Sequence, residues 1–207
     1  MRKLLGIVSM SLGALLLVGA LGLFLWNRTE AQRAARSSAD LIPQLYSAIS
    51  QRTEQSPTAS IQPGTPVELL PQEAKKMTEV EIDGHFYIGY LSIPGLGLEL
   101  PVLSQWDYDL LKTAPCRYSG TTAEANLVLI AHNYRAHFGN LHQLQLGDWV
   151  MFTDMNGVLT QYQVAATDVV PPSSTDEVTA GAFDLALVTC TYGGKTLLVV
   201  YCEADAP

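Results

Sequence analysis

Hydrophobic and polar positions divide this chain into three stretches of different texture. The first, residues 4–26, is an uncharged and almost wholly apolar run of 23 residues that ends at Trp26. As a helix it would extend ~34 Å, enough to cross a hydrocarbon core of about 30 Å. We therefore expect residues 1–27 to form an N-terminal membrane anchor. A cleaved signal peptide with small residues near Ala20 is the alternative, and both interpretations export the rest of the chain.

The second stretch has the texture of a helix followed by a linker. Residues 29–55 are rich in alanine and straight-chain residues, and Leu41, Leu45 and Ile49 recur at helical spacing. Pro43 lies within this segment and predicts a kink or a break. Residues 56–65 are polar and contain proline and glycine, which predicts a linker. Residues 28–79 are thus expected to be a helical stalk with a linker.

The third stretch, residues 80–207, alternates short β-type runs with turn residues. The pair at 149–166 with Asn156-Gly157 between its halves predicts a hairpin. Short helices fit only around 108–111 and 140–144. Many short strands with few helices predict a mainly β domain, closed as a barrel or packed as a sandwich. The strands are expected at 86–93, 98–103, 126–131, 149–153, 159–166, 185–190 and 196–201.

Charge is spread unevenly over the chain, whose formal net charge is −8. Five Lys or Arg and one Glu give residues 1–36 a charge of +4, whereas seven Lys or Arg against 19 Asp or Glu give the remainder −12. An acidic domain repels phosphate backbones, so a nucleic-acid partner is not expected.

The cysteines are too few for a disulfide scaffold. The chain has three, Cys116, Cys190 and Cys202, so at least one thiol stays unpaired within the chain. Whether Cys116 and Cys202 pair is left open by the sequence. A free thiol in an exported domain is either buried and inert or reactive.

Two apolar strands end in residues that have chemical potential. One runs through residues 127–131 into His132, and the other runs through residues 185–189 into Cys190. A strand end holds a side chain rigidly at the rim of a cleft. A thiol is a weak nucleophile at neutral pH, but a nearby histidine favours the thiolate and can protonate a leaving amine. Taken singly, each residue is more often structural, and the 58 positions between them do not by themselves pair them.

Histidines recur at positions 132, 137 and 142. A spacing of five scatters side chains around a helix axis, so we do not expect a zinc site, and no metal ligand is assigned.

The local context resembles the sortase family of cysteine transpeptidases. Leu187-Val188-Thr189-Cys190 is similar to the Leu-x-Thr-Cys end of the sortase nucleophile strand, and residues 127–133 resemble the histidine strand. Residues 87–94 are similar to the entry strand of these enzymes. The resemblance covers about residues 87–202, and several stretches look like the class B and D branch of Gram-positive bacteria.

This resemblance implies a closed eight-stranded mixed β-barrel on a membrane-tethered, extracytoplasmic chain. Cys190 would attack an LPxTG-like sorting signal of a secreted surface protein and form a thioester. His132 would protonate the departing amine and then deprotonate the accepting amine, which would come from a cell-wall precursor or a pilin lysine. No cofactor is implied, and a calcium requirement, the sorting motif and the choice between wall anchoring and pilus assembly stay open.

One departure from the sortase pattern concerns the arginine that follows the nucleophile. It is expected at position 197, where this chain has Leu197, and no arginine occurs after Arg135. Thr189 and Lys195 are the candidates for oxyanion or substrate support, with Lys195 expected to share the strand face of Leu197. The departure raises an alternative function, a weakened or silent sortase-like protein that binds peptide. Hydrolysis of the thioester by water is a third outcome.

Overall fold

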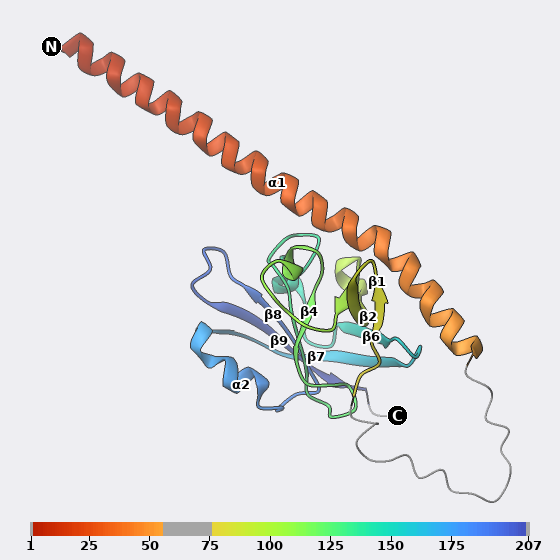
Figure 1. The fold of residues 1–207 in the computed structure, drawn as a ribbon. Helices are drawn as coiled ribbons and strands as arrows, with labels where there is room; N and C mark the ends of the chain where they lie inside the picture. The colour runs from red at the N-terminus through yellow and green to blue at the C-terminus, as the bar shows by residue number, and fades with distance from the viewer. Residues whose placement is uncertain (1, 56–75, 206–207) are drawn as a thin grey trace, which may run out of the picture.

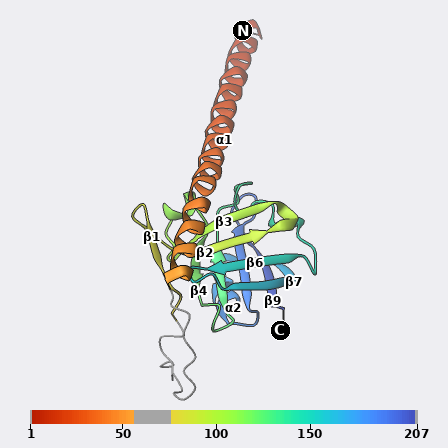
Figure 2. The same cartoon turned by 90° about the vertical axis from the view of Figure 1, so that its right-hand side faces the viewer.

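The computed structural model describes residues 2–55 and 76–205 (Figures 1 and 2). A long helix, α1 (Arg2–Gln55), precedes the strand-rich domain, which also contains the short helix α2 (Thr175–Thr179). Four 3-10 helices lie in connections: η1 (Pro94–Leu96), η2 (Leu110–Lys112), η3 (Leu141–Gln143) and η4 (Pro172–Ser174). The strands are β1 (Val80–Ile82), β2 (His85–Ile93), β3 (Leu98–Leu103), β4 (Cys116–Ser119), β5 (Leu127–Ile130), β6 (Trp149–Asp154), β7 (Leu159–Val170), β8 (Leu185–Cys190) and β9 (Leu197–Ala204).

Eight of the strands form a closed barrel. The hydrogen-bonded order is β2-β3-β4-β5-β8-β9-β7-β6, and a second pairing of β2 with β6 closes the ring. The pairs β3–β4 and β5–β8 are parallel and the others are antiparallel. Strand β1 pairs only with the start of β2 and lies outside the ring. The predicted mainly β fold, with an eight-stranded mixed barrel, is therefore confirmed.

The core occupies both sides of the barrel wall at β5 and β8. Leu127, Leu129, Leu185 and Leu187 face the interior, where they belong to the main apolar cluster. Side chains of the opposite parity, among them Val128, Ala186 and Val188, join a second cluster that includes Val178 of α2. Burial on both faces explains why these two strands read as continuous apolar runs rather than as alternating ones.

The second half of α1 packs against the barrel. Leu41, Ile42 and Leu45 are buried together with Tyr87 of β2 and Leu103 of β3. The Tyr46 hydroxyl donates a hydrogen bond to Glu99. The helix continues through Pro43, so this proline does not end it. Tertiary burial of Leu41, Ile42 and Leu45 on both sides of the proline accounts for the continuity.

Among the residues that the structure describes, no helix is long and apolar enough to cross a membrane, so the anchor predicted over residues 1–27 is not supported. The linker predicted over residues 56–65 lies outside the described residues. Met77 already belongs to the barrel core, three residues before the expected start of the domain at residue 80.

Candidate active site

Parallel pairing brings the two candidate catalytic residues to one end of the barrel. Strands β5 and β8 run side by side from Leu127 opposite Leu185 to Ile130 opposite Val188. Beyond the last pair, the Ala131 N–H donates to the Val188 carbonyl at 3.1 Å. His132 and Cys190 follow directly, and both line one pocket of about 320 Å³. The topology supplies the pairing that their separation in sequence left undetermined.

The pocket lies on the outer face of the sheet. Val188 and Cys190 share this face of β8, since successive strand residues alternate sides. One wall comes from the loop before β4, which contributes Trp106, and the other comes from α2, which contributes Val178. Strand β9 and α2 lie beside each other in the view of Figure 1. The resulting lining is largely apolar, as expected of a site that binds a peptide side chain.

The three thiols differ sharply in their surroundings. Cys116 and Cys202 have no exposed surface, and burial raises the pKa of each thiol to about 12, with Asp107 adding to the effect at Cys116. Cys190 is exposed, and none of the three is in a disulfide. The sequence left open whether Cys116 and Cys202 form a disulfide, and the structure shows both thiols free. Cys190 is the one thiol of the described chain that a large substrate can reach.

Thr189 connects the two strand ends. Its side chain is 4% exposed, and its hydroxyl donates to the Ala131 carbonyl at 2.9 Å. This bond extends the parallel ladder by one step through a side chain. Since Ala131 precedes His132 and Thr189 precedes Cys190, the bond fixes the distance between the two catalytic candidates. In this state the hydroxyl positions the backbone, and the support of a substrate oxyanion by Thr189 stays a prediction.

Leu197 occupies the position at which the sequence pattern places an arginine. It pairs with Cys190 across the antiparallel β8–β9 ladder, and it lines the same pocket. Directly paired residues lie on one face of a sheet, so position 197 does look onto the nucleophile. The structure therefore places an aliphatic side chain where a cationic one was expected.

Lys195 lies outside the pocket lining in this structure, and its support of the substrate stays a prediction. Strand β9 begins at Leu197, and Lys195 lies in the exposed turn before it. That turn is closed by the Thr191 N–H, which donates to the Thr196 carbonyl at 2.9 Å, and Gly194 adopts φ 67° within it. The expectation that Lys195 shares a strand face with Leu197 was wrong, because the backbone there is turned rather than extended.

The two arginines nearest to the site in sequence also lie outside the pocket lining. Arg117 Nε donates to the Ser104 carbonyl at 3.0 Å, and its guanidinium lies 3.7 Å from Glu79. Arg135 is exposed in the loop after β5. Among the described residues that line the pocket, the titratable ones are Tyr108, Tyr118, His132 and Cys190, so His132 is the one of them that can carry a positive charge.

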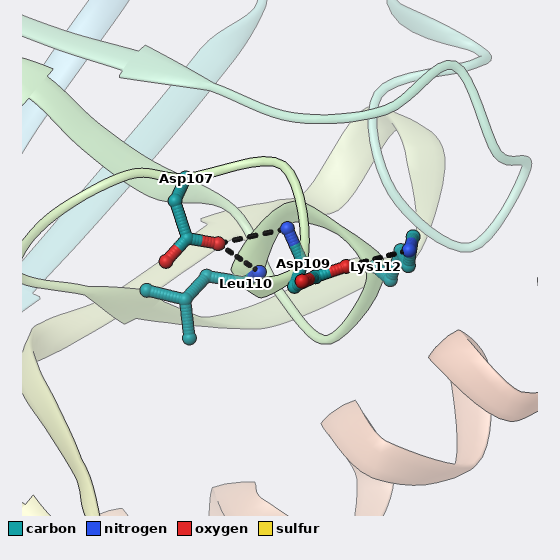
Figure 3. A network of polar contacts seen from close by, with 4 residues as sticks. All are labelled: Asp107, Asp109, Leu110 and Lys112. Carbon is teal, nitrogen blue, oxygen red and sulfur yellow. Dashed lines mark hydrogen bonds and ion pairs between the residues drawn. The ribbon is translucent and has the colours of Figure 1, made fainter.

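A small polar network holds the loop that carries Trp106 (Figure 3). Asp107 Oδ1 accepts hydrogen bonds from the backbone N–H groups of Asp109 and Leu110, each at 2.8 Å. Lys112 and Asp109 form an ion pair at 2.7 Å, which lowers the pKa of the Asp109 carboxyl. These bonds tie Asp107, the residue after Trp106, to the backbone at the start of η2 on the aromatic side of the pocket.

Metal chemistry was not expected from the histidine spacing. Within the described residues, no group of three or more His, Cys, Asp or Glu side chains is arranged to hold a metal ion. His142 Nδ1 lies 3.1 Å from the Gly139 carbonyl, and His137 is fully buried. The absence of a cofactor requirement stays a prediction.

Sequence reasoning missed the aromatic and helical walls of the pocket. Trp106, Tyr108 and Tyr118 come from a loop and from the four-residue strand β4, which is too short to show a period. Helix α2 has only five residues, and Ser174-Thr175-Asp176-Glu177 at its start matches the Ser-x-x-Glu pattern of a helix N-terminus, a signal that the sequence prediction did not use. The aromatic residues themselves were the available signal. Three large rings fall within 13 positions of a mostly polar segment, and apolar groups gathered in such a segment indicate a binding site.

Comparison with known proteins identifies the fold and the family. A family model described as the sortase domain matches residues 91–205, and no curated protein matches the chain. Among solved structures, a Clostridium perfringens sortase D5 transpeptidase is similar at 17% identity, with a TM-score of 0.57 over 84% of this chain and 99% of that one. Sortase C-3 from Streptococcus pneumoniae is similar at 21% identity, with a TM-score of 0.54 over 86% and 91% of the chains.

A third solved structure includes a sorting motif. It is a Clostridium perfringens sortase C with the C-terminal cell wall sorting motif, and it is 23% identical to this chain. Its TM-score is 0.52, over 81% of this chain and 91% of that one. At these identities the structural likenesses show the fold alone, so the expected placement near classes B and D stays a prediction.

Proposed function

This chain belongs to the sortase family, and we propose that it is a cysteine transpeptidase with Cys190 as nucleophile and His132 as acid and base. One observation carries the proposal. The accessible thiol of the described chain lies in the same pocket as a histidine, at the ends of two strands whose spacing is fixed by the Thr189–Ala131 hydrogen bond.

The chemistry requires two steps that share one thioester. The Cys190 thiolate adds to a peptide carbonyl, and the amine leaves with a proton supplied by the His132 imidazolium. The neutral imidazole then takes a proton from the accepting amine, which attacks the thioester and releases the thiolate. Protons balance, because His132 returns to its starting form. Water in place of the amine would give hydrolysis.

The proposed substrate is an LPxTG-like sorting signal. The apolar lining of the pocket suits the aliphatic residues of such a signal, and a family member of known structure contains a cell wall sorting motif. We propose an amine of the cell wall or of a pilin as acceptor, which places the enzyme at the cell surface.

A second candidate function is peptide binding without turnover, and Leu197 is the observation that favours it. The residue faces the pocket beside Cys190, and within the described part of the chain no arginine or lysine lines that pocket. Loss of one oxyanion donor typically costs about 10²–10³ in rate. A protein that keeps the groove and lacks this donor could hold a sorting signal without acylating.

Covalent trapping tests the proposal and separates the two candidates. The full chain would be incubated with a set of LPxTG-like peptides and analysed by intact mass and peptide mapping. We expect an acyl adduct at Cys190 that hydroxylamine releases, and no adduct in Cys190→Ala. Peptide that binds measurably but leaves no adduct in the wild-type protein would favour the binding protein.

A further inference from the structure

Tyr134 lies between two histidines in the loop that follows β5. Its ring centroid is 5.0 Å from that of His132, with 41° between the ring planes, and 5.7 Å from that of His137. The two histidines differ in their surroundings. His132 lines the pocket, whereas His137 has no exposed surface. The tyrosine therefore separates a solvent-facing imidazole from a buried one.

Backbone hydrogen bonds hold this arrangement rigidly. The N–H groups of His137 and Gly139 both donate to the Tyr134 carbonyl at 2.9 Å, and the Phe138 N–H donates to the His132 carbonyl at 3.2 Å. A side chain at Gly139 would approach the Asn133 carbonyl oxygen to 2.5 Å, so the loop packs too tightly for any larger residue there. The tilted approach of the Tyr134 ring to His132 is consequently built into the fold of the loop.

The buried histidine backs the tyrosine as a neutral ring. Burial, and then the nearby His132, lower the pKa of His137 to about 4, while a backbone group of Thr113 opposes this without meeting hydrogen-bond geometry at either ring nitrogen. His137 thus adds no positive charge behind Tyr134 at neutral pH. Of the two histidines beside Tyr134, this leaves His132, which lines the pocket, as the one that can carry a positive charge at neutral pH.

We propose that Tyr134 is a positioning residue that stabilises the imidazolium form of His132 through its ring face. The inference rests on the proposed function of His132. A cation within about 6 Å of an aromatic centroid is attracted by the ring quadrupole. The measured separation of 5.0 Å meets this condition.

The surroundings of His132 make this contribution important. The other titratable residues that line the pocket with His132 are Cys190 of β8, Tyr118 of β4 and Tyr108 of the preceding loop, and the buried His137 interacts with His132 electrostatically. Among the described residues that line the pocket there is no carboxylate and no Lys or Arg, and position 197 is a leucine. A nearby aromatic ring that favours the imidazolium would therefore support the charge that the proposed chemistry uses.

The proposal is tested by following the His132 ring through a pH titration in NMR of the full chain. In Tyr134→Leu, we expect the titration midpoint to fall by about half a pH unit or more. Tyr134→Phe keeps the ring face and should titrate like the wild type. Tyr192→Leu is the matched control, because that tyrosine follows the nucleophile but is 81% exposed. An unchanged midpoint in Tyr134→Leu would overturn the proposal, and so would an equal fall in Tyr134→Phe.

A second readout follows the nucleophile and needs no turnover. The rate at which iodoacetamide alkylates Cys190 is measured as a function of pH. The midpoint of this pH–rate profile should shift in Tyr134→Leu and stay unchanged in Tyr134→Phe. Should Tyr134→Leu fail to fold, Tyr134→Trp replaces it, with an expected rise of the His132 midpoint because tryptophan binds cations best. A fall or no change in Tyr134→Trp would contradict the proposal. An inactive protein with the expected titrations would refute only the proposed function.

Discussion

His137 should make the stability of this protein fall in mild acid. The side chain has no exposed surface, and neither ring nitrogen has a hydrogen-bond partner among the described residues. Burial lowers the pKa of the ring to about 4 in the folded protein, against about 6.5 in an unfolded chain. The unfolded state therefore binds this proton more readily than the folded state does.

The sign and size of the effect follow from proton linkage. Above about pH 6.5 His137 is neutral in both states, so its protonation does not change the free energy of unfolding there. Between pH 6.5 and pH 4 protons favour the unfolded chain, and the loss levels off below pH 4. A difference of about 2.5 pKa units corresponds to about 3 kcal/mol of unfolding free energy lost by pH 4.

His137→Phe isolates this contribution from the carboxylates that titrate in the same range. Urea denaturation of both proteins at pH 7.5 and pH 4 should show that the wild type loses about 3 kcal/mol more than the variant. The variant should also gain about 1–2 kcal/mol at pH 7.5, because an unpartnered polar group leaves the interior.

The matched control is His142→Phe, which removes an exposed imidazole from the same segment. Equal losses between the two pH values in the wild type and in His137→Phe would refute the reasoning, because they would show that the buried ring is already satisfied in the folded state.

Three further predictions concern Leu197 beside the nucleophile, the hydrogen bond from Thr189 to Ala131, and the packing of α1 on the barrel. Leu197→Arg should raise peptide turnover by up to about 10²–10³, with Leu197→Met as the neutral control. Lys195→Ala should change turnover little, because the lysine lies outside the pocket lining. Equal rates in Leu197→Arg and Leu197→Met would contradict the first prediction. Thr189→Val should lower the free energy of unfolding by about 1–2 kcal/mol and reduce acylation, whereas Thr189→Ser should preserve both. A fully active Thr189→Val would show that the hydrogen bond from Thr189 to Ala131 does not position the site. Leu45→Ala should cost about 2–5 kcal/mol in urea denaturation, against almost nothing for the exposed Gln44→Ala, if α1 folds together with the barrel.

Strand positions were largely predictable because hydrophobic runs and turn residues mark them locally. The strands β3 and β8 coincide with their predicted ranges, and the Asn156-Gly157 turn joins β6 to β7 as expected. Strands β1 and β4 were missed. Each has only three or four residues, and each depends on neighbours that are distant in sequence rather than on its own pattern.

The site was predictable in its residues but not in its geometry. Cys190 and His132 were named from the strands that end in them, yet only the parallel β5–β8 pairing shows that both strands end at one pocket. Lys195 was misplaced because the sequence does not show whether the two residues before Leu197 are extended or turned. In the structure they lie in a turn that is closed by hydrogen bonds between Thr191 and Thr196. The role of Tyr134 depends on ring distances that no spacing in the sequence encodes.

The pairing of Cys190 with His132 is tested most directly by native alkylation, which requires no knowledge of the substrate. Brief iodoacetamide treatment of the folded chain at pH 6–7, followed by peptide mapping, should label Cys190 and leave the buried Cys116 and Cys202 unmodified. In His132→Ala the rate at Cys190 should fall by about tenfold or more, because the thiolate loses its cationic partner. Equal labelling of all three cysteines, or an unchanged Cys190 rate in His132→Ala, would contradict the account.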